Sequence, residues 1–591
     1  MRRLTVLVSF MLAISGAITI LTPVAAVSAT YVVDDDGTAS AADCNAADVA
    51  YTLIQDAIDV STSGDAVQVC PGAYVEAINI DTPLTLTGMP GAVIKPDNST
   101  PLLDGGLRRA AVYVDTTDNV TIQGFEVDGT GGTVNIGIYG FNSDNTAVKN
   151  NFVHGMVDDA AQVSGLGIIF YGWGQAVDNN LVRNNTVSHT DHHGIWMGAV
   201  DTDGVTPIDS ENNVVENNTV HHTWQNSDAL PPSALWGGAI GMDAANGGTI
   251  RGNYVHSTGS NQREIMLVNG AYDVSLTNNT LLHSGVADWT QPAIELAAYP
   301  GSNGLTITGN TITATPNSAD GGSLVVYLPD VAGANSFSNN TLELMTTLPP
   351  SFYNGLALDG SLTGNWTISG NEFTGSDLSA GGAAIRLYDG LPSTSAITIS
   401  GNDVTGWANG IRTSDLADAE LLSVHGNRFS GNSSYGVLNG GSDQIDATRN
   451  WWGDISGPSG EGFGDGDAVS VNVTYEPWCF NIACTLFATG GTDGADTLVG
   501  TSAANIIFGF DGADVIKGLA GADRLYGGLG DDVLKGAKGA DFLSGGEGDD
   551  VLKGGKGADS LFGDEDDDYL NGGAGPDSCT GGPGSDTVTN C

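Results

Sequence analysis

Residues 527–562 read GGLGDDVLK GAKGADFLS GGEGDDVLK GGKGADSLF, four consecutive blocks of nine residues with one shared pattern. Each block opens with glycine, carries aspartate at its sixth place and an apolar residue at its eighth. The same register runs without insertion from Gly491 to Thr589, which makes eleven blocks. A strict short period of this kind predicts a repeat structure in which each block adds one similar unit to a stack.

The composition of a block predicts its local structure. The glycine-rich half favours a tight turn, and the second half, such as Asp532–Lys535, favours a short strand with one inward apolar residue. Turns then alternate between two edges, so the same edge recurs every 18 residues. Calcium prefers oxygen ligands, and aspartates of neighbouring turns meet at each edge. The calcium ligands expected at the sixth place are Asp496, Asp514, Asp523, Asp532, Asp541, Asp550, Asp559, Asp568, Asp577 and Asp586.

The blocks match the pattern G-G-x-G-x-D-x-U-x and resemble the hemolysin-type, or RTX, calcium-binding repeats. The resemblance implies a parallel β-roll with several Ca²⁺ ions between its turns. Asn505 and Ala503 depart from the pattern in the second block, and residues 563–568 place extra acids where glycine is usual, so binding there is expected to be altered. The alternative, an acidic glycine linker without metal, does not explain an apolar residue at every eighth place.

A longer repeat fills the middle of the chain. An asparagine followed two residues later by an apolar residue recurs at intervals of 23 to 35 residues, at Asn151, Asn185, Asn218, Asn253, Asn279, Asn310, Asn340, Asn371, Asn402, Asn427 and Asn450. Each interval holds a second apolar strand, such as Ile195–Met197. The pattern predicts one coil per repeat, with the asparagines stacked as an internal ladder.

This region resembles right-handed parallel β-helix proteins of the pectin-lyase-like class over about 31–478. Residues 31–74, with a helix-like stretch at 52–58, are similar to the N-terminal cap of that class, and 450–453 are similar to its closing coil. The predicted fold is all-β, a right-handed parallel β-helix followed by a calcium-binding parallel β-roll. The expected domains are the β-helix at 30–478, a linker at 479–490 and the roll at 491–591.

The N-terminus has the features of a secretory signal peptide. Arg2 and Arg3 precede an apolar stretch at 4–21, and small residues lead to an expected cleavage after Ala29, so residues 1–29 are assigned to the signal. A retained membrane anchor is the alternative; no other stretch is long and apolar enough to span a bilayer. Disulfides form and persist in the oxidising environment outside the cell. The six cysteines form three local pairs, Cys44 with Cys70, Cys479 with Cys484 and Cys579 with Cys591. Zinc ligation, the other use of cysteine, lacks the usual spacing.

The net charge of −50, with 19 Lys plus Arg, makes a nucleic-acid partner unlikely and metal cations natural partners. Eight of the nine histidines lie between 154 and 283, three or four residues after the asparagine of their coil in most cases. These histidines are expected to line one edge of successive coils. Three interpretations remain open: histidine is tolerated at a repeated corner, the edge is a catalytic groove, or the imidazoles hold a transition metal.

The groove interpretation assigns catalysis to His193, His222 and Arg263, and sugar stacking to Trp196, Trp224 and Trp236. Hydrolysis would instead use paired carboxylates, for which Asp243, Glu264 and Glu295 are candidates.

The resemblance to the β-helix class implies a carbohydrate ligand. The expected function is that of a secreted calcium-binding protein whose β-helix binds or processes an extracellular polysaccharide. One alternative is a non-catalytic cell-surface adhesin or matrix protein, and another is a uronate-polymer lyase or C5-epimerase. Residues 139–141, Tyr-Gly-Phe, are similar to part of an alginate C5-epimerase motif, but Asn142-Ser143-Asp144 stands where that motif has Asp-Pro-His.

Overall fold

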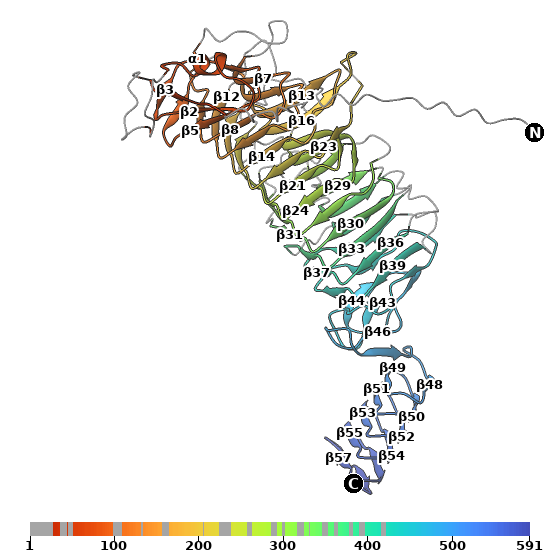
Figure 1. The fold of residues 1–591 in the computed structure, drawn as a ribbon. Coiled ribbons are helices and arrows are strands. Elements are labelled where there is room, and N and C mark those ends of the chain that lie inside the picture. The colour runs from red at the N-terminus through yellow and green to blue at the C-terminus, as the bar shows by residue number, and fades with distance from the viewer. Residues whose placement is uncertain are drawn as a thin grey trace, which may run out of the picture.

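The computed structural model describes residues 28–35, 44, 51–97, 109–131, 134–156, 165–204, 206–223, 238–256, 263–284, 292–297, 302–315, 324–329, 331–345, 353–359, 364–376, 382–388, 396–414 and 421–591. They form one long column of stacked coils, with a narrower stack continuing from its C-terminal end (Figure 1). The wide column is a parallel β-helix, and the narrow one is the nonapeptide roll.

Three long parallel sheets make the walls of the β-helix. Sheet A runs from β1 (Thr30–Val33) to β45 (Val473–Thr474), sheet B from β3 (Gly72–Tyr74) to β40 (Arg428–Ser430), and sheet C starts at β4 (Ile78–Ile80). From β2 (Asp65–Val69) to β41 (Tyr435–Leu438) the strands enter sheets A, B and C in turn, and the short β17 (Ser210–Glu211) is an additional strand of sheet C. The sequence pattern predicts only two strands per coil, because a sheet A strand such as β11 (Ala147–Lys149) has three residues and a single inward side chain, Val148.

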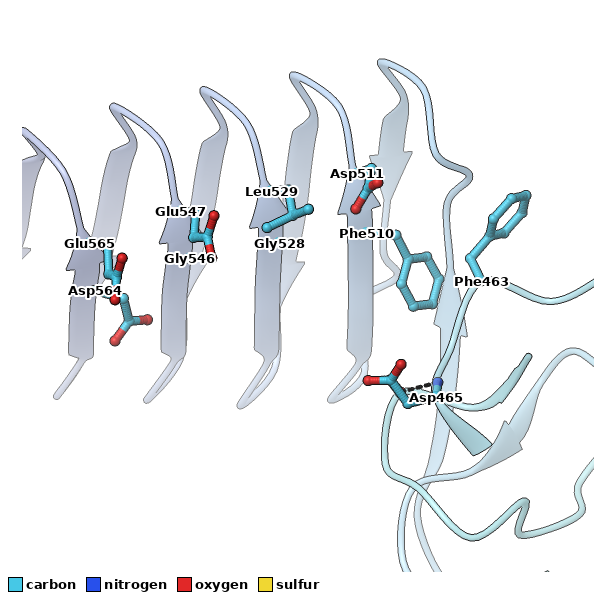
Figure 2. Close-up of a pocket in the computed structure, with 11 residues that line it drawn as sticks. Phe463, Asp465, Phe510, Asp511, Gly528, Leu529, Gly546, Glu547, Asp564 and Glu565 are labelled. Carbon is cyan, nitrogen blue, oxygen red and sulfur yellow. Dashed lines mark hydrogen bonds between the residues drawn. The ribbon is translucent and has the colours of Figure 1, made fainter. Parts of the chain in front are cut away.

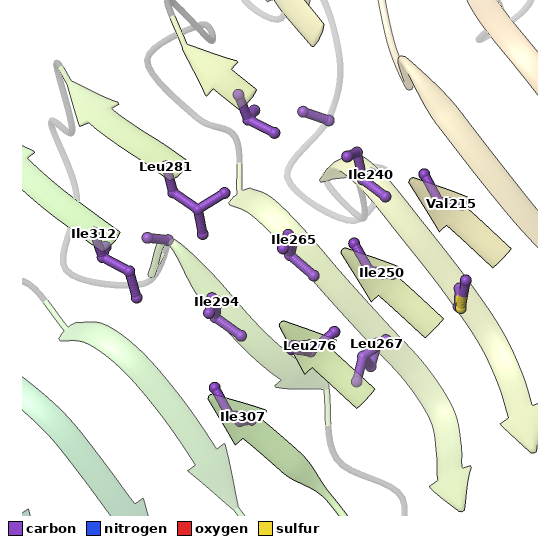
Figure 3. Close-up of a cluster of buried hydrophobic side chains, with 14 of the residues drawn as sticks. Val215, Ile240, Ile250, Ile265, Leu267, Leu276, Leu281, Ile294, Ile307 and Ile312 are labelled. Carbon is purple, nitrogen blue, oxygen red and sulfur yellow. The ribbon is translucent and has the colours of Figure 1, made fainter. Parts of the chain in front are cut away.

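The interior of the β-helix is filled by one apolar residue, or two, from each strand. Figure 3 shows this packing for the middle coils, where Ile250 and Leu276 of sheet A face Ile265 and Ile294 of sheet C and Leu281 of sheet B. Most strands of sheet C have two inward residues, and a small residue precedes them. In Gly194-Ile195-Trp196-Met197 the inward residues are Ile195 and Met197, and Trp196 between them lies on the outer face. The outer face of sheet C is therefore built from alternate residues of each strand.

The predicted asparagine ladder is present from Asn151 to Asn450. Each asparagine uses its backbone N–H and its side-chain amide to donate to the Oδ1 atom of the asparagine in the next coil. For Asn279 and Asn310 these distances are 3.0 and 2.9 Å, and the Asn279 amide also donates to the carbonyl of Ile250 at 2.9 Å. The ladder thus satisfies backbone groups at a buried corner, where an unpaired group would be costly.

The N-terminal end of the column is capped as predicted. Helix α1 (Ile54–Asp59) lays Ile54, Ala57 and Ile58 on the first coil. The carboxylate of Glu76 accepts hydrogen bonds from the first two N–H groups of this helix, which have no partner within it. A disulfide joins Cys44 to Cys70 beside the cap.

The roll consists of two parallel sheets packed face to face. One contains β47 (Phe487–Gly490), β49 (Ile506–Asp511), β51 (Arg524–Leu529), β53 (Phe542–Glu547), β55 (Ser560–Glu565) and β57 (Ser578–Thr580), and the other runs from β48 (Thr497–Val499) to β58 (Thr587–Thr589). The eighth-place residues, including Leu534 and Leu543, form its core. The 18-residue return to the same edge is confirmed, since Val533 pairs with Val551.

The two stacks share packing at their junction. β46 (Trp478–Cys479) pairs with β47, inside the stretch expected as a linker at 479–490. The indole of Trp478 is fully buried and lies 5.8 Å from the ring of Phe508 and 6.3 Å from that of Phe510, measured between ring centroids. Disulfides join Cys479 to Cys484 at this junction and Cys579 to Cys591 at the end of the roll. Among the residues the structure describes, no helix has the length and hydrophobicity needed to cross a bilayer.

Candidate functional sites

The sixth-place aspartates form two columns, one along each edge of the roll. In one column the backbone N–H of Asp532 donates to Oδ1 of Asp550 at 2.7 Å, and in the other the N–H of Asp523 donates to Oδ1 of Asp541 at 2.9 Å. The same bond recurs in both columns from turn to turn. Each edge therefore places one carboxylate in every turn except that of Asn505, as the nonapeptide period predicts.

In eight of these carboxylates the second oxygen has no hydrogen-bond partner. Oδ2 is buried and unpaired in Asp514, Asp523, Asp532, Asp541, Asp550, Asp559, Asp568 and Asp577. In each block this atom lies over the first glycine; a Cβ added to Gly527 would be 2.3 Å from Oδ2 of Asp532. A buried anionic oxygen beside bare backbone is the arrangement that a calcium ion would complete, so the residues present fit the ion.

Burial raises the pKa of Asp532 and Asp541 to about 6 and that of Asp550 to about 7, and the neighbouring aspartates add to the shift. Without a cation the stacked charges oppose one another. The ninth block departs from this pattern, as expected from its extra acids. Asp564 and Asp566 occupy left-handed backbone conformations, with φ of 77° and 75°, and at the place of Asp566 every other block has glycine or alanine.

The predicted catalytic and sugar-stacking residues do not form one site. His193, Trp196 and Arg263 lie on the outer face of sheet C, whereas His222 lies on sheet B in β19 (Thr219–Thr223). Trp224 and Trp236 fall outside the described residues.

The sheet C residues form a continuous outer row. The His193 ring lies 4.3 Å from that of Trp196 in β16 (Ile195–Val200), and its Nδ1 is 3.2 Å from the carbonyl oxygen of Gly238. Burial lowers the pKa of His193 to about 4, so its imidazole is neutral at pH 7. In β23 (Arg263–Tyr272), Arg263 is ion-paired with Glu295, and both side chains are nearly buried.

Asp243 stands beside Trp196 at a β-bulge that the sequence does not reveal. The register between β20 (Gly238–Asn246) and β23 shifts between Asp243 and Ala245, and Ala244 and Asn269 adopt positive φ of 46° and 54°. The amide of Asn269 donates to Asp243 Oδ1 at 2.7 Å. Burial raises the pKa of Asp243 to about 6. Bulges, strained backbone and perturbed carboxyls concentrate at functional sites.

Glycines allow the Asp243 and Trp196 side chains to pack directly on the backbone of the neighbouring strands. A Cβ at Gly198 would be 2.4 Å from Cβ of Asp243 and 3.4 Å from Nε1 of Trp196, and a Cβ at Gly241 would be 2.3 Å from the indole ring. Further along the face, Tyr113 and Tyr139 lie 5.4 Å apart and Tyr139 and Phe141 5.9 Å apart. Sheet C thus carries aromatic rings beside one titratable carboxyl.

Of the other two candidate carboxylates, Glu295 faces outward and Glu264 faces the interior. Glu264 occupies the place that small residues such as Ala239 and Ala293 take in neighbouring coils, and it is fully buried. Its Oε2 is 2.7 Å from Nδ1 of His283, whose exposed fraction is 2%. His283 therefore lies inside the β-helix and not on the histidine edge where the sequence places it.

An open pocket of about 550 Å³ lies where the β-helix meets the roll (Figure 2). Asp511, Glu547, Asp564 and Glu565 line it from the roll, and Phe463 and Asp465 line it from the last β-helix turns. None of the predicted catalytic or calcium-binding residues lines this pocket.

Comparisons with known proteins identify both stacks. A model described as "Right handed beta helix region" matches residues 104–342 and 268–451, and one described as "RTX calcium-binding nonapeptide repeat (4 copies)" matches in five overlapping segments between 490 and 588. The chain belongs to the right-handed β-helix proteins, and it carries RTX calcium-binding repeats at its C-terminal end. A search of curated protein sequences found no match.

Similar solved structures include the catalytic unit of a GH87 α-1,3-glucanase from Streptomyces thermodiastaticus, at 16% identity, covering 73% of this chain and 67% of that one, with a TM-score of 0.40. The surface adhesin PfbA of Streptococcus pneumoniae shares 13% identity, with coverage of 65% and 88% and a TM-score of 0.40. The A-module of the Azotobacter vinelandii mannuronan C-5 epimerase AlgE4 shares 14% identity, with coverage of 67% and 90% and a TM-score of 0.33. Similarity at this level does not bear on the activity of the chain.

Proposed function

We propose that the protein is secreted, that calcium orders its roll, and that the outer face of sheet C binds and processes an extracellular polysaccharide. The observation that carries the polysaccharide proposal is the bulge that holds Asp243 beside the indole of Trp196. An aromatic ring offers a flat apolar surface to a sugar ring. A carboxyl with a pKa near 6 can exchange a proton near neutral pH.

In this proposal each residue has a distinct part. Trp196 stacks on a sugar, Asp243 takes or gives the proton, and Asn269 holds the Asp243 carboxyl in position. The Arg263–Glu295 pair lies on the same face and supplies polar contacts to hydroxyl groups. His193 is a positioning residue here, since its neutral ring packs against Trp196.

The net charge of the chain bears on which class of polysaccharide it binds. A net charge of −50 repels anionic polymers, so a neutral polysaccharide is favoured over a uronate polymer. The calcium ligands in the proposal are the sixth-place aspartates of the roll, from Asp496 to Asp586, with Asn505 as the one position that lacks an acid.

The test is a panel of neutral and uronate polysaccharides, presented to the calcium-loaded full-length protein. Trp196→Ala should weaken binding of the ligand that the wild type prefers, and Asp243→Asn should keep binding while lowering turnover by roughly 10²–10⁴. Phe152→Ala removes an exposed aromatic ring from sheet B and serves as the matched control. Binding that is unaffected by Trp196→Ala would contradict the proposed face. Binding without turnover in the wild type would indicate an adhesin.

A further inference from the structure

Four histidines gather on the outer face of sheet B, away from Trp196 and Asp243. They are His189 in β15 (Thr186–Thr190), His221 and His222 in β19, and His256 in β22 (Tyr254–His256). Ser188, His221 and His256 are paired in register across the three parallel strands. Three successive coils therefore bring four imidazoles to one place.

The rings form two perpendicular stacks. His189 lies 4.9 Å from His222 with an interplanar angle of 3°, and His221 lies 5.0 Å from His256 with an angle of 9°. The planes of His221 and His222 meet at 78°. The ring centroids of His189 and His221 lie 6.2 Å apart and those of His222 and His256 lie 6.4 Å apart, so the four rings form one compact cluster.

His221 and His222 bring two nitrogen atoms into direct contact. Their Nδ1 atoms are 2.6 Å apart. The contact requires one Nδ1 to carry a proton and the other to lack it, and it is lost if both rings are protonated. Two ligands at 2.0–2.1 Å from a tetrahedral metal ion are separated by about 3.3 Å, so a small opening of this pair would place both nitrogens on one ion.

The backbone of His189 and His222 is in a conformation that is unfavourable for residues with a side chain. His189 and His222 adopt left-handed conformations with φ of 51° and 50°, whereas the coil before them has Gly155 there, with φ of 74°. Glycine takes this conformation without cost, and a residue with a side chain does not. Two consecutive coils therefore keep imidazoles where glycine would be more stable, which is the kind of strain that marks functional positions.

We propose that His189, His221, His222 and His256 bind one transition-metal ion of the borderline class to which Zn²⁺ belongs. Imidazole nitrogens prefer such ions, whereas Ca²⁺ prefers the carboxylate and carbonyl oxygens of the roll. The protein would therefore hold two chemically separate kinds of metal site. The ion at the four histidines would join three successive coils on the outside of the β-helix.

A second group on sheet B is the nearest competitor for a metal. Glu126, Asp128 and His154 place their ligand atoms within 4.8 Å of one another, with His154 one coil before His189 and the two carboxylates two coils before it. The ammonium group of Lys95 already lies 2.6 Å from Asp128 Oδ2, so a cation occupies that corner. Substitution of His154 separates the two sites in an experiment.

The experiment uses the full-length protein, freed of transition metals and kept in millimolar calcium. Zn²⁺ is titrated in competition with a chromophoric chelator that does not bind Ca²⁺. In a separate experiment Co²⁺ is added, and the visible absorption spectrum of the bound ion is recorded. The wild type should bind a single Zn²⁺ saturably and melt at a higher temperature with zinc than without it. His221→Gln with His222→Asn should weaken binding by more than the roughly 10–100-fold that loss of an outer partner costs.

Asparagine at 222 tolerates the left-handed backbone, so this double variant should fold and keep its calcium response. His256→Gln is a second variant that leaves both strained positions intact. His154→Asn is the matched control and should bind zinc like the wild type. The absence of saturable zinc binding in the wild type would overturn the proposal, and so would equal affinity in the double variant or a loss of binding only in His154→Asn.

Discussion

At the scale of the residue, the asparagine ladder shows how one side chain can satisfy a whole corner of the β-helix. Asn310 accepts from the backbone and amide of Asn279 and donates to Asn340, and its amide also donates to the carbonyl of Leu276. No shorter or apolar side chain can replace these bonds. The sequence predicts the ladder from spacing alone, since the asparagine must recur once per coil.

Asn310→Ala should lower the free energy of unfolding by about 2–5 kcal/mol, because it leaves the N–H of Asn279 and the carbonyl of Leu276 buried without partners. Urea unfolding followed by circular dichroism measures the change. Asn278→Gly is the control: Asn278 is exposed with φ of 55°, a conformation that glycine accepts. Equal effects of the two substitutions would show that the ladder bonds contribute little.

Asp243 should make the stability depend on pH. Burial raises its pKa to about 6 in the folded protein, whereas an unfolded aspartate titrates near 3.9. The folded state binds this proton more tightly, so the contribution to stability is fully present below about pH 4 and is lost as the pH rises through 6.

Asp243→Asn imitates the protonated carboxyl at every pH. Its stability should match that of the wild type near pH 4 and exceed it above pH 7, measured by urea unfolding at constant calcium. The roll titrates identically in both proteins, so the difference between them isolates Asp243. A difference that does not change with pH would contradict the raised pKa.

At the scale of the element, the roll is the part of the structure that the sequence predicts most fully. Each block has one role for glycine, one for aspartate and one for the apolar residue, and all three recur in register. The β-helix is predicted less completely. A sheet A strand of three residues shows no alternation that differs from loop sequence, so the third sheet appears only in the structure.

The candidate site on sheet C could be predicted only in part. Trp196 and Arg263 are found by residue type, but Asp243 owes its character to a bulge between two strands that are adjacent in space. The prediction that His283 lies on the histidine edge is wrong. Its spacing matches the histidine edge, yet the alternation of β25 (Thr280–Ser284) turns it inward to Glu264.

Removal of calcium from the full-length protein should unfold the roll and leave the β-helix intact. The buried carboxylates lose their counter-ions and repel one another. In excess chelator, circular dichroism should lose part of its β signal, and proteolysis should cut beyond residue 490 while the preceding column survives.

Asp532→Ala with Asp550→Ala should raise the calcium concentration at the folding midpoint by about tenfold or more, because ligand charge sets affinity. Asp493→Ala removes an exposed aspartate outside the sixth place and is the control. Chelator that leaves the spectrum and the protease pattern unchanged would refute calcium-dependent folding.

At the scale of the whole molecule, two stacks with different periods are joined through a single aromatic cluster. Trp478, at the end of the β-helix, packs against Phe508 and Phe510 of the roll, and the apolar core of the column continues into Ile506 and Phe508. The order of the roll can therefore stabilise the last coils of the β-helix (Figure 1).

Trp478→Ala should cost about 3–5 kcal/mol and separate the unfolding of the two stacks. Scanning calorimetry in calcium should show one coupled transition for the wild type and two for the variant. Trp173→Ala, at a tryptophan with an exposed fraction of 46%, should leave the transition unsplit. A single transition at an unchanged temperature in Trp478→Ala would show that the junction does not couple the stacks.

The asparagine ladder has a direction, because from Asn151 to Asn427 each side-chain amide donates to the Oδ1 atom of the asparagine one coil nearer the roll. Each coil therefore presents the same donors and the same acceptor to the coils on either side of it. Among the described residues the ladder bonds repeat from coil to coil, and the column begins at α1 and ends near the buried Trp452 and Trp478. Gene duplication of one whole coil between Asn151 and Asn450 would find its donors and acceptors already in place, so such a protein can grow longer in evolution without any new interface.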